Sequence, residues 1–274
     1  MALSMRAGGT IFRFLKLTIE NRRLLHTLFG AMCPFSAIRV TVAGMTTQVA
    51  TPPARIPPDV KLRLVGDVHG DANAFAYAAA SDRFIVQLGD LTDYGPDSAR
   101  TLRIMFELMD QGRGLFLLGN HDLKLARVLA GQARPDALVR QTIGQLDQAL
   151  RARVLVEVAR APAWLLHGND LLVHGGFHPS MLTMPAPDHG LARAEGPVAR
   201  ALFGEPTGRM QPDGYPERSL RWVDHIPPGI TVYCGHDRRS SDGRPYVRRG
   251  MLGGSAVFLD TGAGKGGHLS WIDL

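Results

Sequence analysis

Six short apolar runs divide most of the chain, and each ends abruptly in a cluster of small and polar residues. The runs occupy residues 61–65, 83–88, 114–118, 171–173, 230–234 and 256–259. The clusters that follow them read GDVHG, GDLTD, GNHD, HGG, GHD and DTG. Runs of this length that are apolar on both faces are typical of strands in the middle of a sheet.

Helical patterns lie between several of these runs, over residues 72–80, 98–111, 124–130 and 135–158. Alternating strands and helices predict a layered α/β domain. Ligands of such sheets bind beyond the carboxyl ends of the strands. Because all six clusters stand at those ends, we expect them to converge on one site.

Composition narrows the function classes further. Hydrophobic residues make up 45% and charged residues 20%, an ordinary globular balance that excludes disorder along the whole chain. Two cysteines, Cys33 and Cys234, exclude a disulfide scaffold and favour a reducing compartment, so we expect a cytoplasmic protein. The sequence has no uninterrupted apolar segment long enough to span a membrane, so we do not expect stable membrane association.

The net charge of +6 is concentrated at the amino terminus. Residues 1–44 hold six basic residues and one acid, whereas the remaining 230 residues hold 25 basic and 24 acidic residues. A nearly neutral body does not have the basic footprint of a nucleic-acid-binding domain, so no nucleic-acid partner is expected.

The first sixty residues form a basic segment and a Pro-rich linker. Apolar residues in 11–24 recur at roughly helical spacing, but basic residues interrupt them. The segment is compatible with a transit peptide, a membrane-surface helix, a disordered tail or an over-extended gene start before Met45. We favour the last two, and we place the domain boundary at residue 60, which leaves 61–274 as the main domain.

The residue types in the clusters indicate a metal centre. The candidates are Asp67, His69, Asp90, Asn120, His174 and His236. Mixed oxygen and nitrogen ligands suit Mn²⁺, Fe or Zn²⁺. Six protein ligands are more than one small cation normally takes, whereas two ions about 3.5–4 Å apart that share one carboxylate would use them all. Any single cluster would more often be an ordinary turn, and it is their repetition that supports the hypothesis.

These motifs resemble those of the calcineurin-like metallophosphoesterases. GDVHG, GDLTDYG, GNHD, HGG and the later GH look most like the bacterial phosphoprotein phosphatase branch, which includes diadenosine tetraphosphate hydrolases. The resemblance covers residues 61–274. It implies a four-layer α/β/β/α sandwich of two mixed sheets with helices outside.

The resemblance also implies roles for individual residues. Asp67 and His69 would bind the first metal, and Asp90 would bridge both ions. The second metal would be bound by Asn120, His174 and His236. His121 would be the general acid, oriented by Asp93. Two divalent ions are implied, Mn²⁺ first and Fe or Zn²⁺ as alternatives.

Three functions remain open. The first is hydrolysis of phosphate monoesters by in-line attack of a metal-bridging hydroxide, as in serine/threonine protein phosphatases. Its partner would be a phosphorylated protein or a small phosphoester, and the chain would be a monomer by default. The second is hydrolysis of dinucleoside polyphosphates. The third, a non-catalytic scaffold of the same fold, is disfavoured by the complete set of ligands.

Two positions depart from the pattern of relatives. Position 238 is Arg where many relatives outside this branch carry a second His, which supports the branch. Position 94 is Tyr where the branch usually has an Arg that grips phosphate. Tyr94 is therefore a candidate substrate contact, and Arg221, Arg238 or Arg239 are candidates to replace the missing guanidinium.

Two loops complete the expectations. Residues 181–217 contain six prolines and predict a long irregular insertion, which is often functional in a compact domain. Residues 260–267 are Gly-rich but do not have the GxxxxGK[ST] order of a phosphate loop. We interpret them as a hairpin turn between the last two strands.

Overall fold

The computed structural model describes residues 56–211, 214–240 and 242–274 in full, together with the backbone of four strands near the amino terminus. Two compact units can be distinguished, Met1–Pro52 and Pro53–Leu274. The first unit contains two antiparallel pairs, β1 (Ala2–Ala7) with β2 (Thr10–Leu15), and β3 (Ile38–Val42) with β4 (Met45–Val49). The backbone of Thr10–Leu15 is thus extended, although its apolar spacing is roughly helical. The interpretation of residues 1–44 as a tail or an over-extended start falls on residues outside those described in full and stays a prediction.

The first of two larger sheets follows the Pro-rich linker and has the order β15-β5-β6-β7. Its parallel strands are β5 (Leu62–Val65), β6 (Phe84–Gln87) and β7 (Gly114–Phe116). The last strand of the chain, β15 (Trp271–Asp273), pairs antiparallel with β5. The sheet is therefore mixed, with three parallel strands whose carboxyl ends lie at one edge.

The second sheet has the order β13-β14-β12-β9-β8. Its central strands β9 (Asp170–Val173), β12 (Thr231–Cys234) and β14 (Ser255–Phe258) are parallel. The edge strands β8 (Trp164–His167) and β13 (Tyr246–Arg249) are antiparallel to their neighbours. This sheet is also mixed.

The two sheets face each other across an apolar layer. Leu64, Val86 and Leu115 of the first sheet pack with Leu172 and Val257 of the second. The residues next to these in the strands belong to a second, larger cluster that includes the helices. Since successive side chains of a strand point to opposite faces, strands that are apolar at every position suit a sheet covered on both sides.

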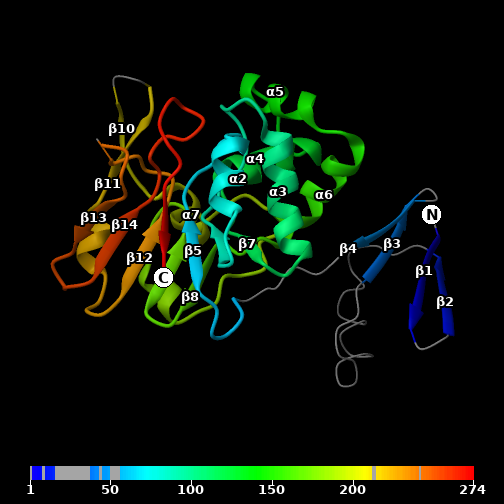
Figure 1. Cartoon of the computed structure of the whole chain (residues 1–274), viewed down its shortest axis with the longest axis horizontal. Coiled ribbons are helices and arrows are strands. Elements are labelled where there is room, and N and C mark those ends of the chain that lie inside the picture. Colours follow the sequence, from blue (N-terminus) through cyan, green and yellow to red (C-terminus); the bar gives the residue numbers. More distant parts are fainter. Residues whose placement is uncertain are drawn as a thin grey trace. The chain divides into compact units, whose positions relative to one another are not determined.

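Helices cover the outer faces of both sheets. On the first sheet they are α2 (Ala72–Ala79), α3 (Ser98–Asp110), α4 (Asn120–Leu129), α5 (Ala137–Gln145) and α6 (Gln148–Arg160), grouped together in Figure 1. Near the second sheet lie α7 (Gly196–Phe203) and the 3₁₀ turns η2 (Pro179–Leu182) and η3 (Arg221–His225). The predicted four-layer α/β/β/α sandwich is confirmed. No helix in the described part of the chain is long and apolar enough to cross a membrane.

Three local expectations need correction. The helical pattern over 135–158 contains two helices, because Asp147 caps a new one by accepting the Leu150 backbone N–H at 2.8 Å. The segment 181–217 is not irregular throughout, since it holds η2, α7 and a hairpin of β10 (Glu205–Met210) and β11 (Pro216–Ser219). Residues 260–267 do not form a hairpin turn, because β14 and β15 belong to different sheets.

Removal of residues 1–44 tests the domain boundary. A chain that begins at Met45 should fold, bind metal and turn over substrate like the full chain, because all the motifs lie beyond residue 60. Thermal unfolding and metal content of the two proteins give the comparison. A melting temperature lowered by more than a few degrees would show that the amino-terminal segment stabilises the main domain.

Candidate metal centre

The proposed ligands all follow the carboxyl ends of parallel strands, and they come from both sheets. Asp67 and His69 follow β5, and Asp90 follows β6. Asn120 is the first residue of α4, which begins four residues after the end of β7. From the second sheet, His174 follows β9 and His236 follows β12.

Asp90 lies at the centre of this group. Its Oδ2 is 3.7 Å from Nε2 of His69 and 3.4 Å from Nε2 of His174. The ligand atoms of Asp67, His69 and Asp90 all lie within 4.8 Å of one another, and so do those of Asp90, His174 and His236. Two potential metal sites thus share one carboxylate, which is the arrangement that a bridging ligand requires.

Backbone carbonyls orient two of the imidazoles. Nδ1 of His69 is 2.9 Å from the Thr92 oxygen, and Nδ1 of His174 is 2.9 Å from the Leu88 oxygen. A carbonyl oxygen only accepts, so each Nδ1 carries a hydrogen, and each Nε2 faces Asp90, where it can bind a proton or a metal ion. Burial alone would lower the pKa of His174, yet the Asp90 carboxylate outweighs it and raises this pKa to about 9. The group therefore attracts positive charge, either protons or metal ions.

The buried polar atoms fit metal ions well. Within the described residues, Oδ2 of Asp67, Nε2 of His69 and Nε2 of His236 are buried and have no hydrogen-bond partner. Such atoms are costly in a protein interior unless something compensates them. Asn120 Oδ1 lies 3.0 Å from His174 Nε2, so a neutral His174 would present two acceptors to each other. A divalent cation in each half of the group would satisfy all of these atoms.

Asp122 is a buried carboxylate that the sequence analysis gave no role, and it holds the backbone of Asp90 in place. Asp122 accepts the backbone N–H of Asp90 at 2.8 Å and that of Leu91 at 3.1 Å. These bonds stabilise a left-handed backbone at Asp90, whose φ is 61°. Burial raises the pKa of Asp122 to about 7, with Asp90 adding to the effect. The sequence indicated a role for Asp122 only through its position as the last residue of the GNHD motif.

The proposed general acid His121 is next to the metal centre and has a carboxylate partner. Its Nδ1 is 2.7 Å from Oδ2 of Asp93, whose other oxygen accepts the Thr142 hydroxyl at 2.6 Å. Its backbone N–H donates to Oδ1 of Asp90 at 2.8 Å. Burial alone lowers the pKa of His121, but the charge of Asp90 and the bond to Asp93 outweigh it, so this pKa is raised. The imidazole is thus oriented and favoured in its protonated form.

Tyr94 lies at the same site, and two residues missed by the sequence analysis accompany it. Its ring centroid is 5.0 Å from that of His69 and 5.3 Å from that of His121. Its hydroxyl is 2.7 Å from the hydroxyl of Tyr215, which belongs to the β10–β11 connection. The ammonium of Lys265 lies 4.6 Å from the centre of the Tyr94 ring. Nothing in the local sequence of Tyr215 or Lys265 indicated these long-range contacts.

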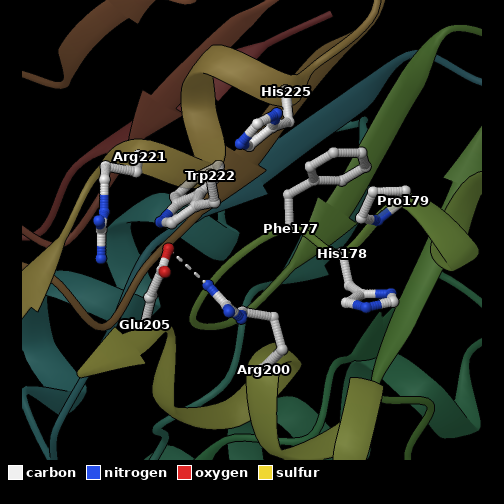
Figure 2. Close-up of a pocket in the computed structure, with 8 residues that line it drawn as sticks. All are labelled: Phe177, His178, Pro179, Arg200, Glu205, Arg221, Trp222 and His225. Atoms are coloured by element: carbon white, nitrogen blue, oxygen red, sulfur yellow. Dashed lines mark ion pairs between the residues drawn. The ribbon is translucent and has the colours of Figure 1, made fainter. Parts of the chain in front are cut away.

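The three candidate arginines have other surroundings. The guanidinium of Arg238 packs so closely over Gly262 that a Cβ there would lie 2.9 Å from its Cζ. Arg239 forms an ion pair with Asp237 at 2.7 Å. Arg221 is exposed and lines a cavity of about 430 Å³ together with Phe177, His178, Pro179, Arg200, Glu205, Trp222 and His225, where Arg200 and Glu205 are paired (Figure 2).

The loop after β14 packs tightly against the metal centre through Gly264, which yields a testable expectation. Gly264 has φ +70°, and a Cβ there would overlap the carbonyl oxygen of His69. Gly264→Ala should therefore lower the free energy of unfolding by about 2–4 kcal/mol and weaken metal binding. Gly266→Ala is the matched control, because its φ is +83° but nothing lies within 4 Å of its Cβ. Only the strain of about 1 kcal/mol is expected there. Equal melting temperatures of the two variants would contradict close packing at Gly264.

Comparison with known proteins agrees with this geometry. The sequence model of the calcineurin-like phosphoesterases matches residues 60–238. An asymmetrical bis(5'-nucleosyl)-tetraphosphatase of Bacillus velezensis is 29% identical over 201 residues, covering 70% of this chain and 74% of the relative. A symmetrical bis(5'-nucleosyl)-tetraphosphatase of Ralstonia nicotianae is 26% identical over 230 residues, covering 81% of this chain and 75% of the relative.

The fold also has solved counterparts. A serine/threonine protein phosphatase from Saccharomyces cerevisiae superimposes with a TM-score of 0.54 at 16% identity, covering 76% of this chain and 70% of that one. At this identity the likeness shows the fold alone. The match of the family model over most of the main domain shows that the chain belongs to the calcineurin-like phosphoesterase family and is a metal-dependent phosphoester hydrolase.

Proposed function

We propose that this enzyme hydrolyses dinucleoside polyphosphates and cleaves a phosphoanhydride bond between two nucleoside ends. The observation that carries the proposal is the environment of position 94. A tyrosine stands there with Lys265 beside it, where a guanidinium would grip the dianion of a monoester. A phosphate within a polyphosphate chain carries less charge than a terminal one and needs less compensation. Relatives named as tetraphosphatases support the same substrate class.

The metal ligands take the roles inferred from the motifs. Asp67 and His69 would hold one divalent ion, and Asn120, His174 and His236 the other, with Asp90 shared between them. We favour Mn²⁺, with Fe or Zn²⁺ as alternatives for this mixed oxygen and nitrogen set. Bound ions supply Lewis acidity, which lowers the pKa of water and neutralises phosphoryl oxygens.

The remaining residues either donate a proton to the leaving group or hold other residues of the site in position. His121 donates a proton from Nε2 to the departing oxygen, because Asp93 occupies its Nδ1. Thr142 orients the Asp93 carboxylate, so both hydrogen bonds hold the imidazole in one direction. Asp122 keeps the Asp90 backbone in place through the two N–H bonds described above.

Phosphate monoesters are the second candidate, in a reaction like that of serine/threonine protein phosphatases. The Asp93–His121 pair favours it, because an alkoxide departs from a phosphoserine only with a proton. The leaving group of a polyphosphate is itself a phosphate of lower pKa and depends less on that proton. The substrate would then be a phosphorylated protein or a small phosphoester.

Localisation and assembly stay proposals as well. The free, buried thiol of Cys234 agrees with a reducing compartment such as the cytoplasm. We propose a monomer that acts on small soluble substrates rather than on nucleic acid or membranes.

A substrate panel with manganese-loaded protein tests the proposal. Diadenosine tetraphosphate should give a kcat/KM at least tenfold above those of a phosphoserine peptide and p-nitrophenyl phosphate. Metal analysis of the same preparation should find two ions per chain. The Asp90→Asn variant, purified in parallel, controls for contaminating phosphatases. A preference for the phosphopeptide over the dinucleotide would favour the second candidate.

A further inference from the structure

Lys265 is a charged group of the site that the roles above do not use. Its side chain is partly buried, and its ammonium lies 4.6 Å from the centre of the Tyr94 ring. Within residues 56–211, 214–240 and 242–274, no carboxylate oxygen lies within 4.0 Å of that ammonium. A partly buried lysine on an aromatic ring, without an ion-pair partner, is available to an anionic ligand.

The position of Lys265 is set by the backbone beside it. The neighbouring Gly264 packs against the carbonyl and Cβ of His69, a proposed metal ligand. Tyr94, on which the ammonium rests, contacts the rings of both His69 and His121. The Lys265 charge also acts electrostatically on His121, His236 and Asp260. The Tyr94 ring thus places the ammonium near His69 of the first metal site and near the proposed general acid His121.

Of the other cations near the centre, Arg218 and Arg239 already have hydrogen-bond or ion-pair partners, and Arg238 is exposed. Arg218 donates to the Phe203 oxygen at 3.2 Å and to the Pro216 oxygen at 3.3 Å. Arg239 is paired with Asp237, and Arg238 packs over Gly262. The hydroxyl of Tyr94 is hydrogen-bonded to that of Tyr215, so it is less available to a phosphate oxygen.

We propose that Lys265 binds the phosphate next to the one under attack and thereby makes the enzyme selective for polyphosphate chains over monoesters. The inference rests on the proposed function, since only a polyphosphate has a second phosphate at this place. An ammonium is a compact point charge with three donors. It therefore suits an internal phosphate, in which two non-bridging oxygens share one negative charge.

Lys265→Met and Lys265→Arg test the proposal, with Lys61→Met as the matched control. Lys61 is an exposed lysine that precedes β5, at the opposite end of that strand from the metal ligands. In Lys265→Met, the ratio of kcat/KM for diadenosine tetraphosphate to that for p-nitrophenyl phosphate should fall about tenfold, mainly through KM. Lys265→Arg should keep most of the ratio, and Lys61→Met all of it. Equal losses on both substrates would overturn the proposal.

Equilibrium binding separates this inference from the proposed function. By titration calorimetry, Lys265→Met should bind inorganic tripolyphosphate about tenfold more weakly, while its Kd for orthophosphate changes by less than twofold. Metal content is measured on the same samples, so a loss of ions is not mistaken for a loss of anion contact. An unchanged Kd for tripolyphosphate overturns the role of Lys265. Failure of the wild type to cleave any dinucleoside polyphosphate overturns the proposed function but leaves this binding test decisive.

Discussion

Asp90→Asn should lose most of its metal and nearly all of its turnover, with a fall in kcat of about 10³-fold or more. The substitution keeps the shape of the side chain, and Oδ1 can still accept the His121 N–H. It removes the negative charge whose Oδ2 lies 3.4 Å from His174 Nε2 and 3.7 Å from His69 Nε2. With Oδ1 kept as the acceptor of the His121 N–H, the amide NH₂ takes the place of Oδ2, and an amide nitrogen is not a ligand for a divalent ion.

Metal analysis after gel filtration and steady-state kinetics measure this effect. Asp136→Asn is the matched control, because it makes the same chemical change at the exposed N-cap of α5, where Asn caps equally well. The control should retain two ions per chain and wild-type turnover. An Asp90→Asn protein with two bound ions and near-normal activity would disprove the shared-carboxylate centre.

His121→Asn should reduce the rate by about 10²–10⁴-fold on a phosphoserine peptide, because the alkoxide then leaves without a proton. The loss should be much smaller on p-nitrophenyl phosphate, whose phenolate departs unaided. Rates on both substrates at saturating concentration give the comparison. His167→Asn in β8, at the edge of the second sheet, is the control and should change neither rate. A uniform loss on both substrates would indicate that His121 binds substrate rather than donating a proton.

The pH profile of Asp93→Asn tests the role of Asp93 in the Asp93–His121 pair. Asp93 contributes to the raised pKa of His121 through its hydrogen bond. Loss of the carboxylate lowers that pKa, so the protonated acid is depleted at a lower pH. The alkaline limb of kcat for the phosphopeptide should therefore move to lower pH, whereas the wild type keeps its activity further into the alkaline range. An unmoved limb would mean that Asp93 does not control the protonation of His121.

Much of the main domain was predictable because its strands are marked locally. Strands β5, β6 and β12 are apolar at nearly every position, and each is followed at once by a Gly-containing turn. Asp67, Asp90 and His236 could be proposed as ligands for the same reason, since parallel strands that end together bring such turns to one edge. The break at Asp147 was missed because helical spacing continues on both sides of it, and only the capping bond shows the new start.

The sequence by itself determined the layered α/β class, the family and the six candidate ligands, because apolar runs and the residues after them are local patterns. Tertiary structure decided the rest, since contacts between distant segments have no local signal. Tyr94 and Tyr215 meet across 121 residues, and Lys265 reaches Tyr94 from the far end of the chain. The sequence of an apolar strand likewise does not specify which sheet it joins. β15 pairs with β5, whose edge offers backbone hydrogen-bonding groups. In this position Ile272 packs against the apolar cluster that contains Leu64.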